Sequence, residues 1–498
     1  MKLRKQRPMR RGAGILLPVS SLPSPYGIGT FGREAYEFVD FLKAAGQKYW
    51  QVLPLGPTSY GDSPYQSFSA FAGNPYYIDL DRLIEKGLLT RRQVGSVDWG
   101  NAHEVDYGVL YQARFKLFRK AFQKSAHQEK AAYLQFCIEH EYWLNDYSTY
   151  MAVKSCFGGE EWIRWPENIR FRDPAAIEKI TGRLQAEIEF WKFCQYEFFT
   201  QWLELKAYAN KNGIEIIGDI PIYVALDSAD VWVYHRLFDL DENRRPNHVA
   251  GVPPDLFSST GQLWGNPLYN WEQMEKENYS WWKNRIKVSA ILYDVIRIDH
   301  FIGVAHYYSI PAHKDNAKEG VWLEGPGEKL ICAISSAIGN KRIIAENLGI
   351  VTPKVKQLLK KSGYPGMKLF EMAFDSGSSN ENLPIHYEKN CVVYGGTHDN
   401  ETLAGFFAHQ KRAVLKFARD YLHVRTNKQI PQGIIYAAYQ STANTVIFLA
   451  QDLLGLDNRA RINTPSTLGG NWRWRLEKGQ LTGRLAKKLK QLTTIYGR

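Results

Sequence analysis

The sequence lacks the patterns that mark several classes of protein. Its 498 residues include only five cysteines, an odd number with no C-x-x-C pair, so neither a disulfide framework nor a zinc site is predicted. No apolar run reaches the length of about 18 residues that a membrane-spanning helix needs. The apolar segment "ILLPV" near the N-terminus is too short for the core of a signal peptide. We therefore expect free thiols, a cytoplasmic location and no membrane partner.

Acidic residues are scarce at the two ends of the chain. The formal net charge is +12, but residues 1–11 carry six basic residues and no acid, and residues 461–498 carry nine basic residues and one acid. The segment between them therefore has a charge of about −2 and is nearly neutral. This argues against a polyanion-binding body, so no nucleic-acid partner is expected. The basic ends are interpreted as solvated, with weak contact to nucleic acid or membrane as the alternative.

Eight short, apolar, β-rich runs recur along the chain. They lie at residues 12–20, 48–55, 214–220, 292–299, 342–347, 367–372, 391–396 and 444–450. Segments with helical periodicity, such as residues 32–46, 328–339 and 353–363, separate most of these runs. Repeated alternation of strand and helix predicts parallel βαβ units. Eight such units favour a closed (β/α)8 TIM barrel over an open doubly wound sheet.

Two intervals between the predicted strands are too long for simple crossovers. We expect residues 56–213 and 220–291 to be inserted subdomains of a single catalytic barrel that spans residues 1–498. The first interval has mainly helical patterning, so a largely helical insert is predicted there. The second contains residues 251–267, which are dense in glycine, proline and aromatic residues and are therefore predicted to form an ordered loop.

The run "DVIRID" at residues 294–299 combines apolar and charged side chains. In a strand, Ile296 and Ile298 share one face, whereas Val295, Arg297 and Asp299 share the other. A surface ion pair would explain the charged pair and would contribute little to stability. The other predicted strands decide between this explanation and a functional site.

Acidic residues stand at the carboxyl ends of four predicted strands. Asp219, Asp299 and Glu346 end or follow their strands, and His398 and Asp399 follow the run at 391–396. Each acid alone fits a helix N-cap. Because the carboxyl ends of barrel strands face the same rim, we expect these side chains to lie together and to form the reactive site.

Two kinds of chemistry suit such a cluster. Metal binding is disfavoured because no H-x-x-x-H or H-x-H pair occurs and Arg297 would repel a cation. Glycosyl transfer through paired carboxyl groups, about 5–5.5 Å apart in retaining enzymes, fits better. Arg297 would keep Asp299 ionised as a nucleophile. The apolar context "IIAE" would let Glu346 act as the acid/base. No metal or cofactor is expected.

Aromatic residues make up 14% of the chain and are frequent in the predicted loops at 59–77 and 260–271. Flat rings stack on the apolar faces of pyranose sugars, and neighbouring polar groups bind the hydroxyls. Core packing is the alternative for any single ring. The glycine and proline residues around these aromatics favour exposed loop walls and a sugar ligand.

Five ordered motifs resemble one known family. They are "GDIPIYVALDSADVW" (218–232), "GVPPDLFSSTGQLWGNP" (251–267), "RIDHF" (297–301), "AENLG" (345–349) and "GTHDNET" (396–402). They closely resemble the 4-α-glucanotransferases called amylomaltase or disproportionating enzyme, which form glycoside hydrolase family 77 of the α-amylase clan. The resemblance spans nearly the whole chain. It implies a (β/α)8 barrel with inserted subdomains and without the C-terminal β-domain of amylases.

The resemblance also implies roles for individual residues. Asp299 would be the nucleophile, Glu346 the general acid/base and Asp399 the transition-state stabiliser. Arg297 and His398 would bind around the reacting sugar. The implied remaining substrate-binding residues are Asp219, Tyr60, Ser63, Tyr65, Asp255, Phe257, Gln262, Trp264 and Asn463.

The expected reaction moves an α-1,4-glucan segment from a donor to the 4-hydroxyl of glucose or of another glucan, without a cofactor. The expected partners are therefore α-1,4-glucans, maltooligosaccharides and glucose. An α-amylase-type hydrolase, which uses the same carboxyl groups with water as acceptor, is the first alternative. A non-catalytic glucan- or nucleic-acid-binding protein is the second.

Overall fold

An eight-stranded parallel sheet forms the centre of the protein. The computed structural model describes residues 3–59, 61–254 and 258–498. The strands of this sheet are β1 (Gly12–Leu16), β2 (Tyr49–Gln51), β3 (Glu215–Ile220), β6 (Val295–Ile298), β9 (Arg342–Ala345), β10 (Gly366–Leu369), β11 (Cys391–Tyr394) and β12 (Thr445–Leu449). Seven of the eight predicted runs contain one of them, and β10 begins one residue before the run at 367–372.

The strand order identifies the sheet as a barrel. The order is β10-β11-β12-β1-β2-β3-β6-β9, so each strand lies beside its sequence neighbours without the reversal of a doubly wound sheet. The end strands β9 and β10 approach each other. The backbone N–H of Ala345 in β9 donates a hydrogen bond of 3.0 Å to the carbonyl of Pro365, the residue before β10. The predicted (β/α)8 fold is confirmed.

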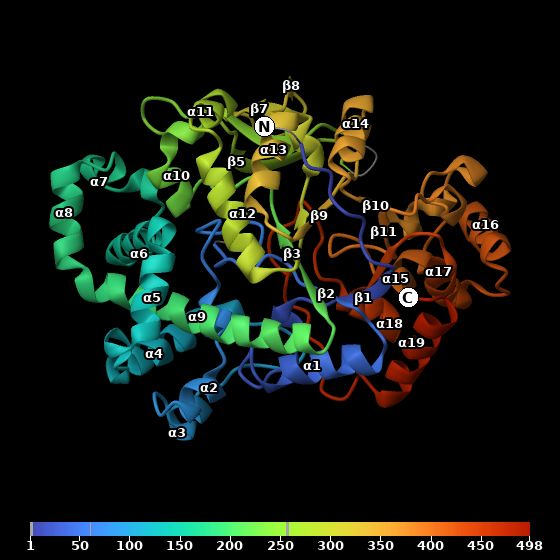
Figure 1. Ribbon diagram of the computed structural model, residues 1–498, viewed down its shortest axis with the longest axis horizontal. Coiled ribbons are helices and arrows are strands. Elements are labelled where there is room, and N and C mark those ends of the chain that lie inside the picture. The colour runs from blue at the N-terminus through green and yellow to red at the C-terminus, as the bar shows by residue number, and fades with distance from the viewer. Residues whose placement is uncertain (1–2, 60, 255–257) are drawn as a thin grey trace.

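Helices surround the barrel and connect successive strands (Figure 1). Those that pack beside the strands are α1 (Arg33–Ala44), α9 (Gln185–Lys211), α12 (Ser280–Leu292), α13 (Glu328–Ala337), α14 (Pro353–Ser362), α17 (Ile430–Gln440) and α19 (Gly483–Ile495). The three helical segments predicted at 32–46, 328–339 and 353–363 correspond to α1, α13 and α14. The connection from β11 to α17 also contains α15 (Leu403–Ala408) and α16 (Arg412–Leu422), and α18 (Ala450–Leu454) follows β12.

The connection between β2 and β3 is mainly helical. Before α9 it contains α2 (Leu80–Glu85), α3 (Arg91–Gly95), α4 (Tyr107–Lys124), α5 (Ala131–Glu139), α6 (Glu141–Cys156), α7 (Glu167–Arg170) and α8 (Pro174–Arg183). Figure 1 shows α4–α8 on one side of the barrel and α15–α19 on the other. The next connection, from β3 to β6, contains α10 (Ala229–Val233) and α11 (Trp271–Lys276) before α12.

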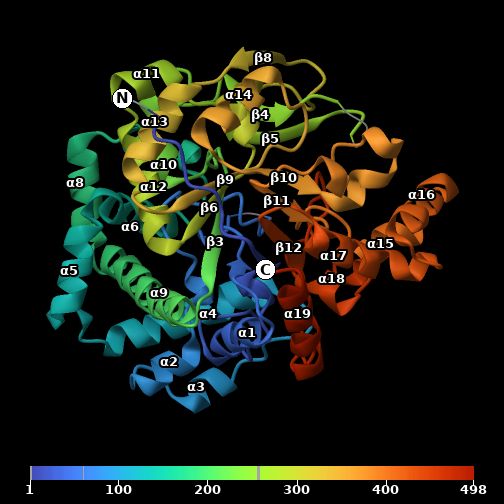
Figure 2. The ribbon, with the colours of Figure 1, turned by 45° about the vertical axis from the view of Figure 1, so that its right-hand side comes forward.

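A second sheet of four antiparallel strands lies beside the barrel, near the top of Figure 2. Its order is β5-β4-β7-β8, with β4 (His248–Val252), β5 (Gln262–Pro267), β7 (His306–Pro311) and β8 (Val321–Glu324). The prediction that 251–267 is a loop throughout is therefore wrong at both ends, where the chain forms the β4–β5 hairpin. The pairing of Val249 with Ile310, across 61 positions, stabilises this hairpin, and a local sequence pattern does not reveal it.

Alternation along the barrel strands separates two cores. Ile296 and Ile298 of β6 belong to the outer core beneath the helices. Val295 belongs to the core inside the barrel. The ring of Tyr293 packs directly against the backbone of β3 at Gly218. A Cβ atom on Gly218 would lie 2.1 Å from this ring, so only glycine fits at the position before Asp219.

Candidate active site

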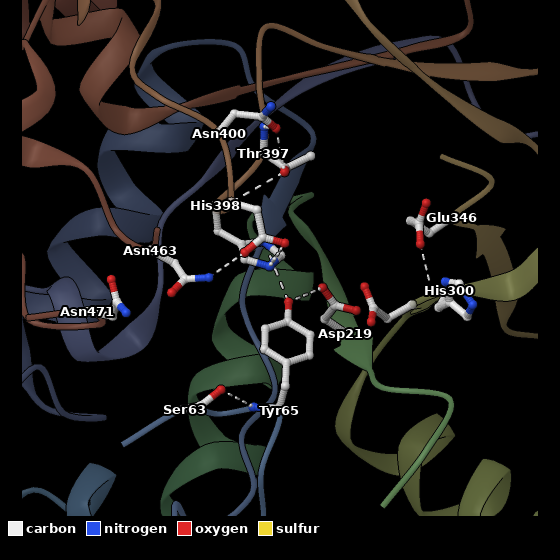
Figure 3. A network of polar contacts seen from close by, with 12 residues as sticks. Ser63, Tyr65, Asp219, His300, Glu346, Thr397, His398, Asn400, Asn463 and Asn471 are labelled. Atoms are coloured by element: carbon white, nitrogen blue, oxygen red, sulfur yellow. Dashed lines mark hydrogen bonds and ion pairs between the residues drawn. The ribbon is translucent and has the colours of Figure 1, made fainter. Parts of the chain in front are cut away.

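The predicted polar residues gather at the carboxyl end of the barrel (Figure 3). Asp219 lies near the end of β3, Asp299 follows β6 directly and Glu346 follows β9 directly. His398 and Asp399 lie in the loop after β11. Because parallel barrel strands end at one rim, residues up to 180 positions apart in sequence come together at this site.

Arg297 joins two of these carboxylates. Its Nη1 atom lies 2.7 and 2.6 Å from the two oxygens of Asp219 and 2.8 Å from Oδ1 of Asp299. Its Nε atom donates to the sulfur of Met367 at 3.4 Å inside the barrel. Arg297 and Asp219 are 3% and 1% exposed, whereas the Asp299 side chain is 27% exposed. The pair of Arg297 and Asp299 is therefore not a surface ion pair, and of these three residues only Asp299 opens toward solvent.

Tyr65 covers the other side of Asp219. Its hydroxyl donates to Asp219 Oδ2 at 2.9 Å and lies 3.5 Å from Nδ1 of His398. The rings of Tyr65 and His398 stack at 5.0 Å, with 17° between their planes. Trp472 lies against both rings at 5.9 Å. His398 Nε2 is 3.4 Å from Asp399 Oδ2. The stacked rings of Tyr65 and His398 therefore connect Asp219 to Asp399.

Asp399 is held by residues from the segment after β12. Asn463 Nδ2 donates to Asp399 Oδ1 at 2.6 Å. Arg461 donates from Nη2 to the Asp399 carbonyl at 2.8 Å and from Nε to the Asn463 carbonyl at 2.7 Å. These bonds fix both the backbone and the carboxylate of Asp399.

A chain of hydrogen bonds supports the Asp399 loop from behind. The Asn400 side-chain oxygen accepts from the backbone N–H of Thr397 at 2.9 Å and from its hydroxyl at 2.8 Å. Asn400 Nδ2 donates to Glu371 Oε1 at 2.6 Å. Burial, with the added negative charges of Asp452 and Glu401, raises the pKa of Glu371 well above its ordinary value. Burial therefore favours the protonated form of Glu371, which supports this loop through its hydrogen bond to Asn400.

Glu346 differs from Asp299 in its surroundings. It is 6% exposed, and its two oxygens accept from the backbone N–H groups of His300 and Leu348 at 2.6 and 2.5 Å. Burial and the charge of Asp299 raise the pKa of Glu346 to about 7, against the opposing charge of Arg297. Glu346 can therefore hold a proton near neutral pH and release it within the site.

A cleft of about 440 Å³ opens beside Asp299, His398 and Asp399, whereas Asp219, Arg297 and Glu346 lie behind its lining. Of the predicted residues, Ser63, Tyr65, Gln262, Trp264, Asp299, His398, Asp399 and Asn463 line it. Trp264 Nε1 donates to Gln262 Oε1 at 3.1 Å, so these two residues form one wall on β5. The predicted site residues Tyr60, Asp255 and Phe257 lie outside the described residues.

Several cleft residues were missed by sequence reasoning. They include Tyr223, Asn266, His300, Asp315, Asn316 and Trp472. His300 follows Asp299 directly in the motif "RIDHF", and this position after a strand-end acid is a signal for the site. Asp315 and Asn316 lie between β7 and β8, and no local pattern connects them to the barrel.

The aromatic prediction is correct in part. Tyr65 and Trp264 line the cleft, but Phe71, Tyr76 and Tyr77 are 5–8% exposed and belong to the main hydrophobic core. Rings in the same glycine-rich segment therefore serve both purposes, and composition alone did not separate them.

The described residues contain no cluster of three or more histidine, cysteine or acidic side chains arranged to hold a metal ion. Within the same ranges, every helix is either too short or too polar to cross a membrane. All five cysteines are free thiols.

An arginine-bound carboxylate and a protonatable carboxyl group at one rim of a barrel fit the class of enzymes that act on glycosidic bonds through paired acids. The model of the 4-alpha-glucanotransferase family matches residues 17–482. The chain is 49% identical to the 4-alpha-glucanotransferase of Clostridium butyricum over 96% of this chain and 99% of that one. It is 46% identical to the 4-alpha-glucanotransferase of Streptococcus pneumoniae over 98% of each chain.

A solved structure gives the same assignment. Amylomaltase from Streptococcus agalactiae, in complex with acarbose, superposes with a TM-score of 0.95 at 41% identity, over 98% of this chain and all of that chain. The chain therefore belongs to the 4-alpha-glucanotransferase family. The resemblance inferred from the five motifs is confirmed over the full length.

Proposed function

We propose that the site performs retaining transfer of α-1,4-glucan segments, with Asp299 as nucleophile and Glu346 as general acid/base. The observation that carries this assignment is the difference between the two carboxyl groups. Asp299 accepts a charge-assisted hydrogen bond from Arg297, which stabilises a carboxylate. Glu346 is buried, and its pKa of about 7 allows it to hold a proton. One group can attack while the other protonates.

In the first half-reaction, an Asp299 oxygen attacks the anomeric carbon of the donor glucan, and the bond from that carbon to the glycosidic oxygen breaks. Glu346 gives its proton to the departing oxygen, so the shorter glucan leaves with a free 4-hydroxyl. The transferred segment remains as an ester on Asp299. Because Oδ1 of Asp299 is bonded to Arg297, we assign the attack to Oδ2.

In the second half-reaction, the 4-hydroxyl of glucose or of another glucan enters the place of the leaving group. Glu346, now a carboxylate, takes the hydroxyl proton while the oxygen attacks the anomeric carbon and the ester bond to Asp299 breaks. One α-1,4 bond has been exchanged for another. No cofactor is needed, because bonds of the same type break and form.

The remaining groups are proposed to hold the reacting sugar. Asp399, fixed by Asn463, is positioned to stabilise positive charge in the transition state, and His398 to bind the sugar hydroxyls beside it. Tyr65 and Asp219 complete this side of the site. Donor and acceptor subsites are assigned to Tyr60, Ser63, Asp255, Phe257, Gln262 and Trp264, of which the described members line the cleft.

The inserts are proposed to shape these subsites. Residues 56–213 would carry the donor-side loop, and residues 220–291 would carry the 251–267 segment that excludes water from the acceptor side. We further propose maltooligosaccharides as substrates and a cytoplasmic role in glucan and maltose metabolism. The five free thiols suit a reducing compartment.

The proposal is tested by incubating the purified protein with maltotriose and following free glucose, longer maltooligosaccharides and total reducing ends together. Longer products and glucose at constant reducing ends are expected for transfer. Rising reducing ends without longer products would instead establish the amylase-type hydrolase, and no change in the substrate would refute both enzymatic assignments.

A further inference from the structure

Two arginines outside the active site have an unusual backbone conformation. Arg172, between α7 and α8, has φ 60°, and Arg244, in the turn before β4, has φ 66°. Glycine enters this left-handed region at no steric cost, whereas a residue with a Cβ atom is strained there. Neither arginine lines the cleft. Strain of this kind often marks a functional site, and the proposed reaction uses neither residue.

Two connections between barrel strands bring these arginines together. Trp232 Nε1 in α10 donates to the carbonyl of Ile169 in α7 at 3.1 Å, and Figure 1 shows these two helices beside each other, away from the barrel. The guanidinium of Arg172 lies 4.4 Å from the centre of the Trp232 ring. The guanidinium of Arg244 lies 5.3 Å from the centre of the ring of Phe171, the residue before Arg172. Both cations therefore lie where α7 and α10 meet.

The turn that carries Arg244 is held by its own backbone. The N–H of Arg244 donates to the carbonyl of Asp241 at 3.0 Å, and the N–H of Asp241 donates to the carbonyl of Arg245 at 2.7 Å. Oδ1 of Asp241 accepts from the N–H groups of Asn243 and Arg245, both at 2.8 Å. These bonds maintain the left-handed residue without its side chain. The guanidinium of Arg244 is therefore not needed for the turn, and the Asp241 carboxylate serves the backbone.

Positive charge is in excess around Arg244. Together with Arg236, which follows α10, Arg172 and Arg244 form an arginine cluster. In the part of the chain that the structure describes, the one ion pair of this cluster joins Arg172 Nη2 to Asp146 Oδ1 at 3.3 Å. Burial and the charge of Arg236 lower the pKa of Arg244. Burial, with the charges of all three arginines, lowers the pKa of His235 to about 4. The cluster therefore carries three positive charges against one carboxylate, beside a neutral imidazole.

A bound anion would offset this excess of positive charge. Like charges held close together raise the free energy of the folded protein, and an anion between them lowers it. A guanidinium presents its N–H groups in a planar fork that matches the oxygens of a phosphate group, and such charge-assisted hydrogen bonds are stronger than neutral ones. Arg236 is exposed and Arg244 is half-buried, so both can reach a ligand from solvent. The neutral imidazole of His235 can donate one further hydrogen bond.

We propose that the arginine cluster binds a phosphate group, either as inorganic phosphate or as the phosphate of a small monoester such as a sugar phosphate. Arg236 and Arg244 would bind its oxygens directly, and Arg172 would add its charge. The site is separate from the cleft, and it does not depend on the proposed transfer reaction. Segments of the two inserts, rather than the barrel, form it.

The test is a calorimetric titration of the full-length protein with sodium phosphate, with glucose 6-phosphate and, for comparison, with sodium chloride at the same ionic strength. We expect saturable binding of the phosphate compounds and none of chloride. Tighter binding of glucose 6-phosphate would identify a monoester as the ligand, and tighter binding of phosphate would identify the inorganic ion. Arg244→Gly and Arg236→Gln should each weaken the affinity about tenfold, the usual effect of losing a hydrogen bond to a charged group.

Arg244→Gly also separates binding from packing. Glycine adopts the left-handed backbone without strain, so this variant should melt close to the wild type in the absence of phosphate. Phosphate should raise the melting temperature of the wild type more than that of the variant. The matched control is Arg245→Gln, which removes a positive charge from the exposed neighbouring position of the same turn. It should keep the affinity of the wild type, and all three variants should act on maltotriose as the wild type does.

Three results would overturn the inference. One is a wild type that binds neither phosphate compound in the millimolar range. The second is an unchanged affinity in Arg244→Gly, which would leave packing on Phe171 as the only role of this guanidinium. The third is an equal loss of affinity in Arg245→Gln, which would indicate a general effect of surface charge. None of these titrations contains maltotriose, so the proposed function holds or fails separately, in the assay of its products.

Discussion

Arg297 Nη1 lies 2.8 Å from Asp299 Oδ1 while it also contacts both oxygens of Asp219. The cation is therefore shared between a buried carboxylate and a partly exposed one. Sharing with Asp219 orients the Asp299 carboxylate through Oδ1 and leaves its second oxygen, Oδ2, for the proposed attack.

Replacement of the two proposed reactive acids should separate their roles. Asp299→Asn should abolish turnover of maltotriose and of α-maltotriosyl fluoride, because no ester can form. Glu346→Gln should lower maltotriose turnover by a factor of about 10²–10⁴, but should still release one equivalent of fluoride in the first turnover, because that leaving group needs no proton. Pre-steady-state fluoride release and product analysis with both donors check this. Absence of a fluoride burst in Glu346→Gln would contradict its assignment as the acid.

The pH dependence should follow Glu346. Its pKa is raised to about 7, so the protonated form required for the first half-reaction disappears as the pH rises through that value. We expect kcat/KM to fall on the alkaline side with an apparent pKa near 7, which belongs to the Glu346–Asp299 pair. A rate that stays constant to strongly alkaline pH would be incompatible with this role.

The same ionisation should affect stability. A raised pKa in the folded state means that the folded protein prefers protonated Glu346, so this contribution is present at low pH and is lost as the pH rises through about 7. Asp452, whose pKa burial also raises to about 7, adds to the trend. Melting temperatures measured across this range should fall less in Glu346→Gln than in the wild type.

Loss of Arg297 should destabilise the fold as well as the site. Arg297→Met would leave Asp219, which is 1% exposed, without its cation. Removing one partner of a buried pair costs about 3–5 kcal/mol, and part of this cost should be recovered in acid, where Asp219 can be protonated. Denaturant unfolding at two pH values measures it. Arg297→Lys, which keeps the charge but loses the shared geometry, should be milder in stability and still poor in kcat.

Asn463 should act through the orientation of Asp399. Asn463→Ala removes the 2.6 Å hydrogen bond and should lower kcat about tenfold, at the usual value of such a bond to a charged group. Asn463→Asp should be worse, because it places a second carboxylate against Asp399. Steady-state kinetics give the order. An Asn463→Asp variant as active as the wild type would show that this hydrogen bond does not orient Asp399 for the reaction.

Glu371 offers a test of the support behind the Asp399 loop. Glu371→Gln keeps an oxygen for Asn400 and removes the ionisable group, so kcat should stay close to that of the wild type. Glu371→Leu leaves Asn400 Nδ2 unpaired in a buried position and should lower both kcat and the melting temperature. If the leucine variant matched the glutamine variant, the hydrogen bond would have no positioning role.

The barrel and its acids were predictable because each depends on local information. In a run such as 292–299, the alternation of side chains is visible within the run itself and indicates a strand. Asp299 and Glu346 follow directly after the ends of their strands. The second sheet was not predictable, because its paired strands β4 and β7 are separated in the sequence by β5, β6 and the helices between them. Arg498 is a further case: at the basic end expected to be solvated, it is 7% exposed and donates to the carbonyls of Tyr439 and Ala443.

The small antiparallel sheet joins a segment that precedes β6 to a segment that follows it. β4 and β5 come before β6, β7 and β8 come after it, and β4 pairs with β7. In protein engineering, residues 248–324 should therefore be exchanged between proteins as one segment. A chimera that imports the β4–β5 hairpin of a relative without its β7–β8 partner would bring mismatched pairing to the wall of the cleft, so this wall is best exchanged between relatives as the whole unit.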